Sequence, residues 1–322
     1  MRIDVKQAAE FLRERDDFLI LMHGNPDGDT LGCGCALCGA LQRMGKRAKA
    51  VCPDEIPRRF DYLFKAVIEQ RVFEPKTVVC VDVADTKLLG DMKGLGDGAE
   101  LCIDHHLSNT GYAKRTLVRP EYAAACELVY EVIKELGVPF DGELANCIYT
   151  GTATDTGCFK FSNTTAQTHI IAAEMIGCGA EFAMINYVNF DLKTQGRIRL
   201  EQEVMKNIRY FANGHIAMIT VPLSLQESIP DIDSDDVGAL SNIPRQIEGV
   251  DIGICVKEKK SGVYKASMRS SERVNVAEIC AEFGGGGHER AAGCSFYGGT
   301  IEEAGSNVVR ACCKALERAG IE

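Results

Sequence analysis

The sequence predicts an α/β protein with two domains, the first of which is built on a parallel sheet. The chain has 322 residues, 46% of them hydrophobic, which is enough for two cores at roughly 100–200 residues per domain. In its first half, helix-like segments alternate with short segments that are apolar at every position rather than at every second one. Such strands are typical of a parallel sheet that helices cover on both faces.

The elements of the first half follow from local residue patterns. Residues 5–15 have apolar side chains at helical spacing and come directly after Asp4, which is a suitable N-cap. The apolar run over residues 18–22 is of strand length, which predicts a buried strand. Further strands are predicted at residues 78–81 and 101–103, and further helices at residues 31–44, 123–136 and 144–154.

The second half indicates a connecting helix followed by a smaller α/β domain. Residues 194–210 have a long polar pattern at helical spacing, which suits a helix between two domains. A strand is predicted at residues 215–219 and a hairpin at residues 252–268, with turn residues at 257–262. We therefore predict a first domain over residues 1–185, a helical connector over 186–212 and a second domain over 213–322.

Composition excludes several classes of protein. The 36 basic residues are outnumbered by 46 acidic ones, and the resulting net charge of -10 argues against binding of long duplex nucleic acid. No apolar run approaches the about 18 residues that could span a membrane. The N-terminal residues also lack the charged and apolar blocks of a signal peptide. We expect a cytoplasmic protein without a membrane partner.

The chain contains fifteen cysteines, scattered along its length. In a long chain without an export signal they are expected to be small buried side chains rather than disulfides. Cys33, Cys35 and Cys38 lie close together in sequence, but no nearby fourth ligand completes a structural zinc site.

Imidazole and carboxylate side chains follow the predicted strands at the point where each strand ends. The first strand is followed by His23, Asp27 and Asp29, the second by Asp82, and the third by Asp104, His105 and His106, while Asp155 ends a helix of small residues. Parallel-sheet proteins bind ligands beyond the carboxyl ends of their strands. Capping of turns by aspartate is the alternative explanation for each cluster alone, but it does not account for four clusters.

Carboxylates gathered at one edge of a sheet would repel one another, and divalent cations would relieve that repulsion. Mixed imidazole and carboxylate ligands without thiolate favour manganese, with cobalt or magnesium as alternatives. The set is too large for one ion and suits two ions that share a carboxylate. Because such a pair is the usual clamp for phosphoryl hydrolysis, the residues predict a metal-dependent phosphoesterase.

These residues, taken in order over residues 18–160, resemble the four motifs of the DHH phosphoesterase superfamily. In the second half, residues 267–271 and 284–288 (Ser-Met-Arg-Ser-Ser and Gly-Gly-Gly-Gly-His) resemble the signature of the DHH-associated substrate-binding domain. The resemblance implies the following metal ligands: His23 and Asp27 for one ion, Asp29, His105 and Asp155 for the other, and Asp82 between them. It further implies that Asp104 orients His105 and that His106 faces the substrate phosphate as a proton donor or charge stabiliser.

The resemblance also implies a substrate-binding set in the second domain, namely Arg269, Ser270, Gly285, Gly286, Gly287 and His288. Residues 244–273 hold seven lysines and arginines against four acids, and most of these cations are expected on a solvated hairpin face. Arg269 is the predicted phosphate contact because its planar guanidinium suits bidentate binding. The glycine run would let backbone amides approach an anion, although a flexible loop is the alternative.

Within the superfamily, the two-domain layout resembles the bifunctional oligoribonuclease and pAp phosphatase group, where pAp is 3'-phosphoadenosine 5'-phosphate. The function implied is degradation of single-stranded RNA of about two to five nucleotides to nucleoside 5'-monophosphates, and removal of the 3'-phosphate of pAp to give AMP. One alternative is a phosphodiesterase for dinucleotide signals such as pApA or c-di-AMP, and another is a non-catalytic nucleotide-binding regulator. The oligomeric state, a homodimer included, is left open.

Overall fold

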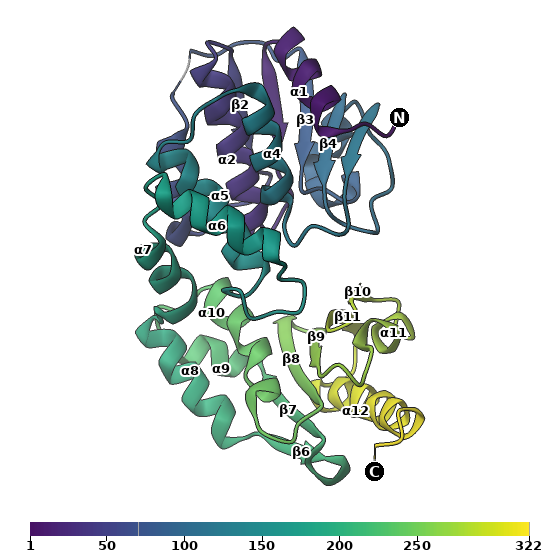
Figure 1. Ribbon diagram of the computed structural model, residues 1–322. Coiled ribbons are helices and arrows are strands. Elements are labelled where there is room, and N and C mark those ends of the chain that lie inside the picture. The colour runs from purple at the N-terminus through teal and green to yellow at the C-terminus, as the bar shows by residue number, and fades with distance from the viewer. Residues whose placement is uncertain (70, 322) are drawn as a thin grey trace. The chain divides into compact units, whose positions relative to one another are not determined.

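The computed structural model describes residues 1–69 and 71–321 (Figure 1). The chain forms two compact units, Met1–Leu192 and Lys193–Glu322. The segment predicted as a connector over residues 186–212 is therefore divided, because its first residues belong to the first unit and the remainder belongs to the second.

The first unit contains a five-stranded sheet in the order β2-β1-β3-β4-β5, and the sheet is parallel throughout, as the sequence predicts. Its strands are β1 (Phe18–Leu21), β2 (Ala48–Val51), β3 (Thr77–Val81), β4 (Leu101–Asp104) and β5 (Arg115–Val118). Its longer helices are α1 (Val5–Glu14), α2 (Gly28–Arg43), α4 (Ala125–Leu136), α5 (Gly142–Asp155) and α6 (Ala166–Gly177). The shorter ones are η1 (Arg58–Ala66), η2 (Thr86–Met92), α3 (Lys93–Gly96), α7 (Phe182–Asn186) and the π-helix η3 (Tyr187–Asp191).

Both faces of the central strands β1, β3 and β4 are buried, which explains why these strands are apolar at nearly every position. In β1, Phe18 and Ile20 join the core formed with α2, α4 and α5, whereas Leu19 and Leu21 join a second core with η2. The two short strands β2 and β5 were not predicted, because each has a charged residue among its four positions and so lacks a continuous apolar run.

The second unit contains a six-stranded mixed sheet in the order β10-β11-β9-β8-β7-β6. Its strands are β6 (Arg209–Phe211), β7 (Ile216–Val221), β8 (Ile252–Lys260), β9 (Val263–Ser270), β10 (Gly286–His288) and β11 (Ala291–Tyr297). Helices α11 (Val276–Ala281) and α12 (Ile301–Arg318) pack on one face. The other face is covered by α8 (Gln195–Lys206), α9 (Leu223–Ser228), α10 (Ser234–Ala239) and the short η5 (Leu240–Asn242).

Three local predictions for this unit need correction. The polar helix ends at Lys206, and its Leu200 and Val204 pack against the sheet instead of bridging two domains. Strand β8 continues to Lys260 through a bulge, so the turn is confined to Ser261 and Gly262. For the glycine run, the alternative of a flexible loop does not hold throughout, because Gly286 and Gly287, with His288, pair with β11 as strand β10.

Among the residues that the structure describes, no helix is both long enough and apolar enough to cross a membrane.

Candidate metal centre

The predicted ligands come together at the carboxyl edge of the parallel sheet. Asp82 directly follows β3, Asp104 is the last residue of β4, and Asp155 is the last residue of α5. Asp27 is the N-cap of α2, where its side chain accepts the backbone N–H groups of Asp29 and Thr30. The strand order explains the gathering, since β1, β3 and β4 are neighbours in the sheet.

One group of side chains surrounds the imidazole of His23. Its Nε2 lies 3.8 Å from Asp27 Oδ1 and 3.4 Å from Asp82 Oδ2. The other ring nitrogen, Nδ1, is 2.9 Å from the carbonyl oxygen of Gly24. In a metal-binding histidine, one ring nitrogen usually donates a hydrogen bond to a backbone carbonyl while the other nitrogen faces the metal ligands.

A second group surrounds the imidazole of His105 in the same way. Its Nε2 lies 3.2 Å from Asp155 Oδ2 and 3.8 Å from Asp29 Oδ2. Its Nδ1 is 3.2 Å from the carbonyl oxygen of Tyr122. Sequence analysis did not single out Tyr122, because a backbone carbonyl leaves no signature in the residue type.

Asp82 connects the two groups. Its Oδ2 faces His23, whereas its Oδ1 lies 3.7 Å from His105 Nε2. Oδ1 is buried and accepts no hydrogen bond from any residue that the structure describes. Asp82 also has a φ of 56°, a left-handed conformation that is costly for aspartate and that concentrates at functional sites.

The electrostatics of the cluster fit divalent cations. Burial, together with the nearby carboxylates of Asp29 and Asp27, raises the pKa of Asp82 well above its usual range. Burial and the charge of Asp29 have the same effect on the pKa of Asp155. The orphaned oxygen of Asp82 and this mutual repulsion are the features expected of a carboxylate set that binds cations.

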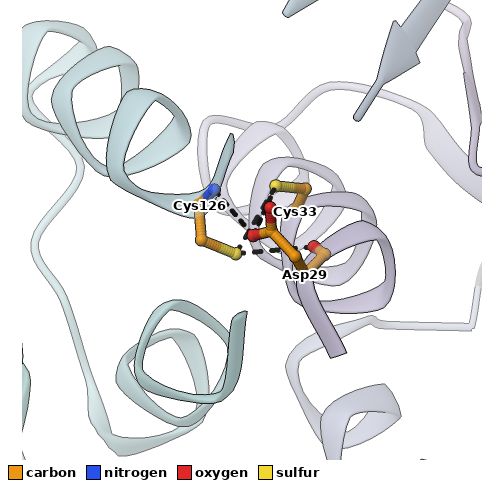
Figure 2. Close-up of side chains that lie close together, drawn as sticks. All are labelled: Asp29, Cys33 and Cys126. Carbon is orange, nitrogen blue, oxygen red and sulfur yellow. Dashed lines mark hydrogen bonds between the residues drawn. The ribbon is translucent and has the colours of Figure 1, made fainter. Parts of the chain in front are cut away.

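Backbone groups at the start of α4 hold the carboxylate of Asp29 in place (Figure 2). Its carboxylate accepts the backbone N–H groups of Ala125 at 2.6 Å and Cys126 at 2.9 Å. The thiol of Cys33 lies 3.7 Å from Asp29 Oδ1 and 3.4 Å from the sulfur of Cys126. A side chain at Gly151 would not fit, because a Cβ there would lie 2.2 Å from Cys126 Sγ and 2.6 Å from Asp29 Oδ1.

The two thiols beside Asp29 are protonated hydrogen-bonding groups. Burial raises the pKa of Cys126 to about 12 and that of Cys33 well above its ordinary value. Both sulfurs are free of disulfide bonds. Cys33, Cys35 and Cys38 are fully buried, as the composition predicts.

Asp104 contacts a different histidine ring from the one expected. Its Oδ1 is 2.8 Å from His106 Nδ1, and it also accepts the backbone N–H of His105 at 2.8 Å. Its Oδ2 accepts Asn109 Nδ2 at 2.5 Å. The expectation that Asp104 orients the ring of His105 is therefore wrong, since the His105 ring is held by Tyr122 and the His106 ring by Asp104.

This pairing favours the ionised form of Asp104 and the cationic form of His106. Burial alone would raise the pKa of Asp104, but hydrogen bonds from His106 and Asn109 outweigh it and lower the pKa. Burial alone would lower the pKa of His106, but its hydrogen bond to Asp104, together with the negative charges of Asp104, Asp29 and Asp27, outweighs burial and raises the pKa. His106 Nδ1 also lies 3.4 Å from Asp82 Oδ1, at the junction of the two groups.

In the second unit, the predicted substrate residues lie around the end of β9. Arg269 is half-buried, and its guanidinium donates to Asn242 Oδ1 and to the carbonyl of Met268, both at 3.0 Å. The hydroxyl of Ser270 donates to the carbonyl of Val274 at 2.6 Å, so it stabilises the following loop. The predicted glycine-rich residues Gly285, Gly286 and Gly287 and the exposed His288 lie at or within β10, which pairs with β11.

Two further cations on this side of the sheet were missed by the sequence analysis. Lys257 was assigned to a solvated hairpin, yet it is only 5% exposed and its ammonium donates to Ser241 Oγ at 3.1 Å. Arg245 packs against Gly253, which pairs with Arg269 in the sheet, and its Nε is buried without a hydrogen-bond partner. No carboxylate of a described residue lies within 4.0 Å of any of these three cations, an arrangement suited to an anionic ligand.

Asp251, at the start of β8, holds the loop that follows Arg269. It is 3% exposed and accepts hydrogen bonds from Ser271 Oγ at 2.6 Å and Arg273 Nη2 at 2.7 Å. Its Oδ2 is also 2.8 Å from His215 Nδ1. Burial alone would raise the pKa of Asp251, but the bonds from Ser271, His215 and Arg273 outweigh it and lower the pKa.

Replacing Asp251 by asparagine is expected to lower the free energy of unfolding at pH 7 by about 2 kcal/mol, the typical contribution of hydrogen bonds to a charged group. Because the folded pKa is depressed, this contribution is present above the unfolded pKa of about 3.9. It is lost as the pH falls through the lower folded value. Urea unfolding of both proteins from pH 7 to pH 3 measures the difference in the free energy of unfolding. A difference that stays constant over the acid range would contradict a depressed pKa of Asp251.

Comparison with known proteins identifies both domains. Residues 17–152 match the N-terminal domain of the DHH family, and residues 222–316 match the DHHA1 domain. A Thermus thermophilus relative named bifunctional oligoribonuclease and PAP phosphatase NrnA is 31% identical over 308 residues, which cover 94% of this chain and 90% of the relative. A relative of the same name from Bacillus subtilis is 26% identical over 289 residues, covering 88% of this chain and 90% of the relative.

Solved structures have the same fold. An exopolyphosphatase-related protein from Bacteroides fragilis matches with a TM-score of 0.88 and 25% identity, over 98% of this chain and 97% of that one. RecJ from Thermus thermophilus, solved in complex with Mn²⁺, matches in fold with a TM-score of 0.56 and 16% identity, over 96% of this chain and 54% of that one. The resemblance seen in the sequence motifs is confirmed: the chain belongs to the DHH family, together with the relatives named bifunctional oligoribonuclease and PAP phosphatase NrnA.

Proposed function

We propose that this chain is a two-metal phosphoesterase that degrades very short oligoribonucleotides to nucleoside 5'-monophosphates and removes the 3'-phosphate of pAp to give AMP. The observation that carries the proposal is the Asp82 carboxylate, whose two oxygens face the imidazoles of His23 and His105. The names of the relatives that match along most of the chain support the substrate class. Nucleotide substrates and a chain whose fifteen cysteines are all free suit a cytoplasmic enzyme.

The proposed ligand sets follow the two groups. His23 and Asp27 would hold one cation, Asp29, His105 and Asp155 the other, and Asp82 would contact both. We propose Mn²⁺, with Co²⁺ or Mg²⁺ as alternatives, because the donors are imidazole nitrogens and carboxylate oxygens. When bound, such a pair supplies Lewis acidity toward water and phosphate oxygens.

The remaining residues of the centre act on the substrate through charge and orientation. His106 is held through Nδ1 by Asp104, which raises its pKa and favours the cationic ring, so it would stabilise negative charge on the phosphate. Nε2 is then the ring atom through which it would pass a proton to the leaving oxygen. Asp104 is a positioning residue, since its contacts are to His106, Asn109 and the backbone.

The second unit would bind the 5'-phosphate end of the substrate. Arg269 and Lys257 have no carboxylate partner among the described residues and would supply positive charge. His288, at the end of β10, lies two strands across from Arg269, because both residues pair with Ala291 of β11. Both proposed substrates have a 3'-oxygen bonded to the phosphorus that is attacked. A site that binds a 5'-phosphorylated nucleotide therefore accommodates both reactions.

The test is turnover of pAp, pApA and a 5'-phosphorylated RNA trinucleotide after removal of metal with a chelator. The apoprotein is expected to be inactive, and Mn²⁺ is expected to restore release of phosphate and AMP from pAp and of 5'-monophosphates from RNA. Turnover of pApA alone would favour the dinucleotide-signal alternative. Binding of all three without turnover in the presence of Mn²⁺, Co²⁺ or Mg²⁺ would contradict an enzymatic role.

A further inference from the structure

The segment that follows Asp155 is an unusual and well-fixed turn. Gly157, Cys158 and Phe159 are consecutive residues with φ values of 56°, 59° and 62°. The turn is closed by backbone hydrogen bonds from Cys158 to Ala153 at 2.7 Å and from Phe161 to Thr156 at 3.0 Å. Consecutive left-handed residues are costly, so this backbone is a candidate for a functional role.

The turn presents the ring of Phe161 to solvent. A Cβ at Gly157 would lie 2.4 Å from Phe161 Cζ, so the ring rests directly on the glycine backbone. Phe161 is nevertheless 57% exposed. Its neighbour Phe159 behaves differently, because it packs against Tyr149 and His169 with ring centroids 5.9 Å and 5.2 Å away. Phe161 pairs with no aromatic ring or cation among the residues that the structure describes.

The segment that carries Phe161 is anchored to backbone groups beside the metal centre. Asn163 Nδ2 donates to the carbonyl of Asp155 at 3.2 Å and to the carbonyl of Ala123 at 3.1 Å. Ala123 adjoins Tyr122, whose carbonyl holds the His105 ring. The turn that carries Phe161 is thus linked to both sides of the group formed by His105, Asp155 and Asp29.

We propose that Phe161 is the platform on which the nucleobase of the substrate stacks while the 3'-phosphate of that nucleotide lies at the metal centre. This inference rests on the proposed function. An exposed aromatic face is the group that binds unpaired bases without regard to their identity. It also suits an acidic site, since a neutral ring adds affinity for a nucleotide without adding a charge.

The absence of tryptophan from the chain provides a direct binding test. Phe161→Trp introduces a single tryptophan, whose fluorescence is expected to be quenched by AMP but not by ribose 5-phosphate, which lacks the base. Tyr297→Trp is the matched control, because Tyr297 is 80% exposed and pairs with Val263, at the far end of β11 from Arg269. Its fluorescence is expected to be insensitive to AMP.

Steady-state kinetics provide a second test of the stacking proposal. Phe161→Ala is expected to raise KM for pAp and pApA by about 5- to 100-fold, as loss of one stacked base does, with kcat nearly unchanged. Phe161→Tyr keeps the ring and is expected to behave as wild type. On the abasic analogue of pAp, wild type and Phe161→Ala are expected to have equal kcat/KM.

Three results would overturn the inference. The first is no quenching of the Phe161→Trp fluorescence by AMP, and the second is an unchanged KM of Phe161→Ala for pAp. The third is a loss of kcat/KM in Phe161→Ala that is as large on the abasic analogue as on pAp. A shift of Phe161→Ala to smaller mass in sedimentation, with unchanged KM, would instead assign the ring to contact with a second copy. The fluorescence experiment measures nucleotide binding and does not depend on hydrolysis. If wild type fails to hydrolyse pAp and RNA, the proposed function fails while the stacking test still gives an answer.

Discussion

Replacing Asp82 by asparagine is expected to lower kcat/KM for pAp and for short RNA by more than about 100-fold, since loss of a residue outside the ligand set already costs about 10- to 100-fold. Asparagine keeps the size of the side chain but removes one anionic oxygen. Because the two oxygens of Asp82 face His23 and His105, the substitution would weaken both halves of the centre together. Initial rates at saturating Mn²⁺ measure the loss.

The matched control is Asp85→Asn. Asp85 lies three residues further along and caps η2 by accepting the backbone N–H of Lys87, a role that asparagine also fulfils. Its activity is expected to equal that of wild type. An Asp82→Asn protein that binds two Mn²⁺ and retains full turnover would contradict the shared-carboxylate arrangement.

The Asp82→Asn variant also tests whether Asp82 serves the stability of the protein or its function. Asp82 is buried among carboxylates that raise its pKa, so asparagine is expected to leave the metal-free protein at least as stable as wild type. Mn²⁺ is expected to raise the melting temperature of wild type much more than that of the variant. Such a pattern is typical of a site whose charge repulsion is retained for ligand binding rather than for folding.

Replacing Arg269 by alanine is expected to lower kcat/KM for pApA by about 100-fold, since truncating one partner of a buried, hydrogen-bonded charge pair costs about 2–5 kcal/mol. The loss is expected mainly in KM. Arg269→Lys is expected to recover only part of it, because an ammonium lacks the planar pair of donors. On ApA, which lacks the 5'-phosphate, the variants and wild type are expected to differ little.

Lys265→Ala is the control for net charge, because Lys265 is an exposed cation on the same strand. It is expected to leave KM unchanged. An equal effect of Arg269→Ala on pApA and ApA would show that Arg269 does not bind the 5'-phosphate.

Much of the site could be predicted because chemistry and topology coincide in the first unit. Residues 18–22 are apolar throughout, since both faces of β1 are buried, and that run indicates a parallel strand. The carboxyl ends of neighbouring parallel strands meet at one edge, so His23, Asp82 and His105 were expected to converge before any distance was known. Two further predicted ligands come from helices: Asp29 lies at the start of α2, which packs on the sheet, and Asp155 ends α5, which packs against α2.

The parts that could not be predicted depend on contacts between distant segments. The hydrogen bond from the Cys126 backbone to Asp29 joins residues 97 positions apart. Asp104 contacts the ring of His106 rather than that of His105 because of side-chain rotamers, which the local sequence does not specify. Lys257 looked like a turn residue because it stands among charged neighbours, yet the helical segments that cover the sheet leave it 5% exposed.

The sequence by itself determined the fold class, the family and the set of imidazole and carboxylate residues that gathers at the edge of the parallel sheet. These features follow from residue types at fixed positions along strands and turns. The tertiary structure alone decided which oxygen of Asp82 faces which histidine, which ring Asp104 holds, where the unpaired cations of the second unit lie and that Phe161 is exposed. The physical reason is that burial and hydrogen bonding depend on what other segments contribute at each point, and no local pattern records those neighbours.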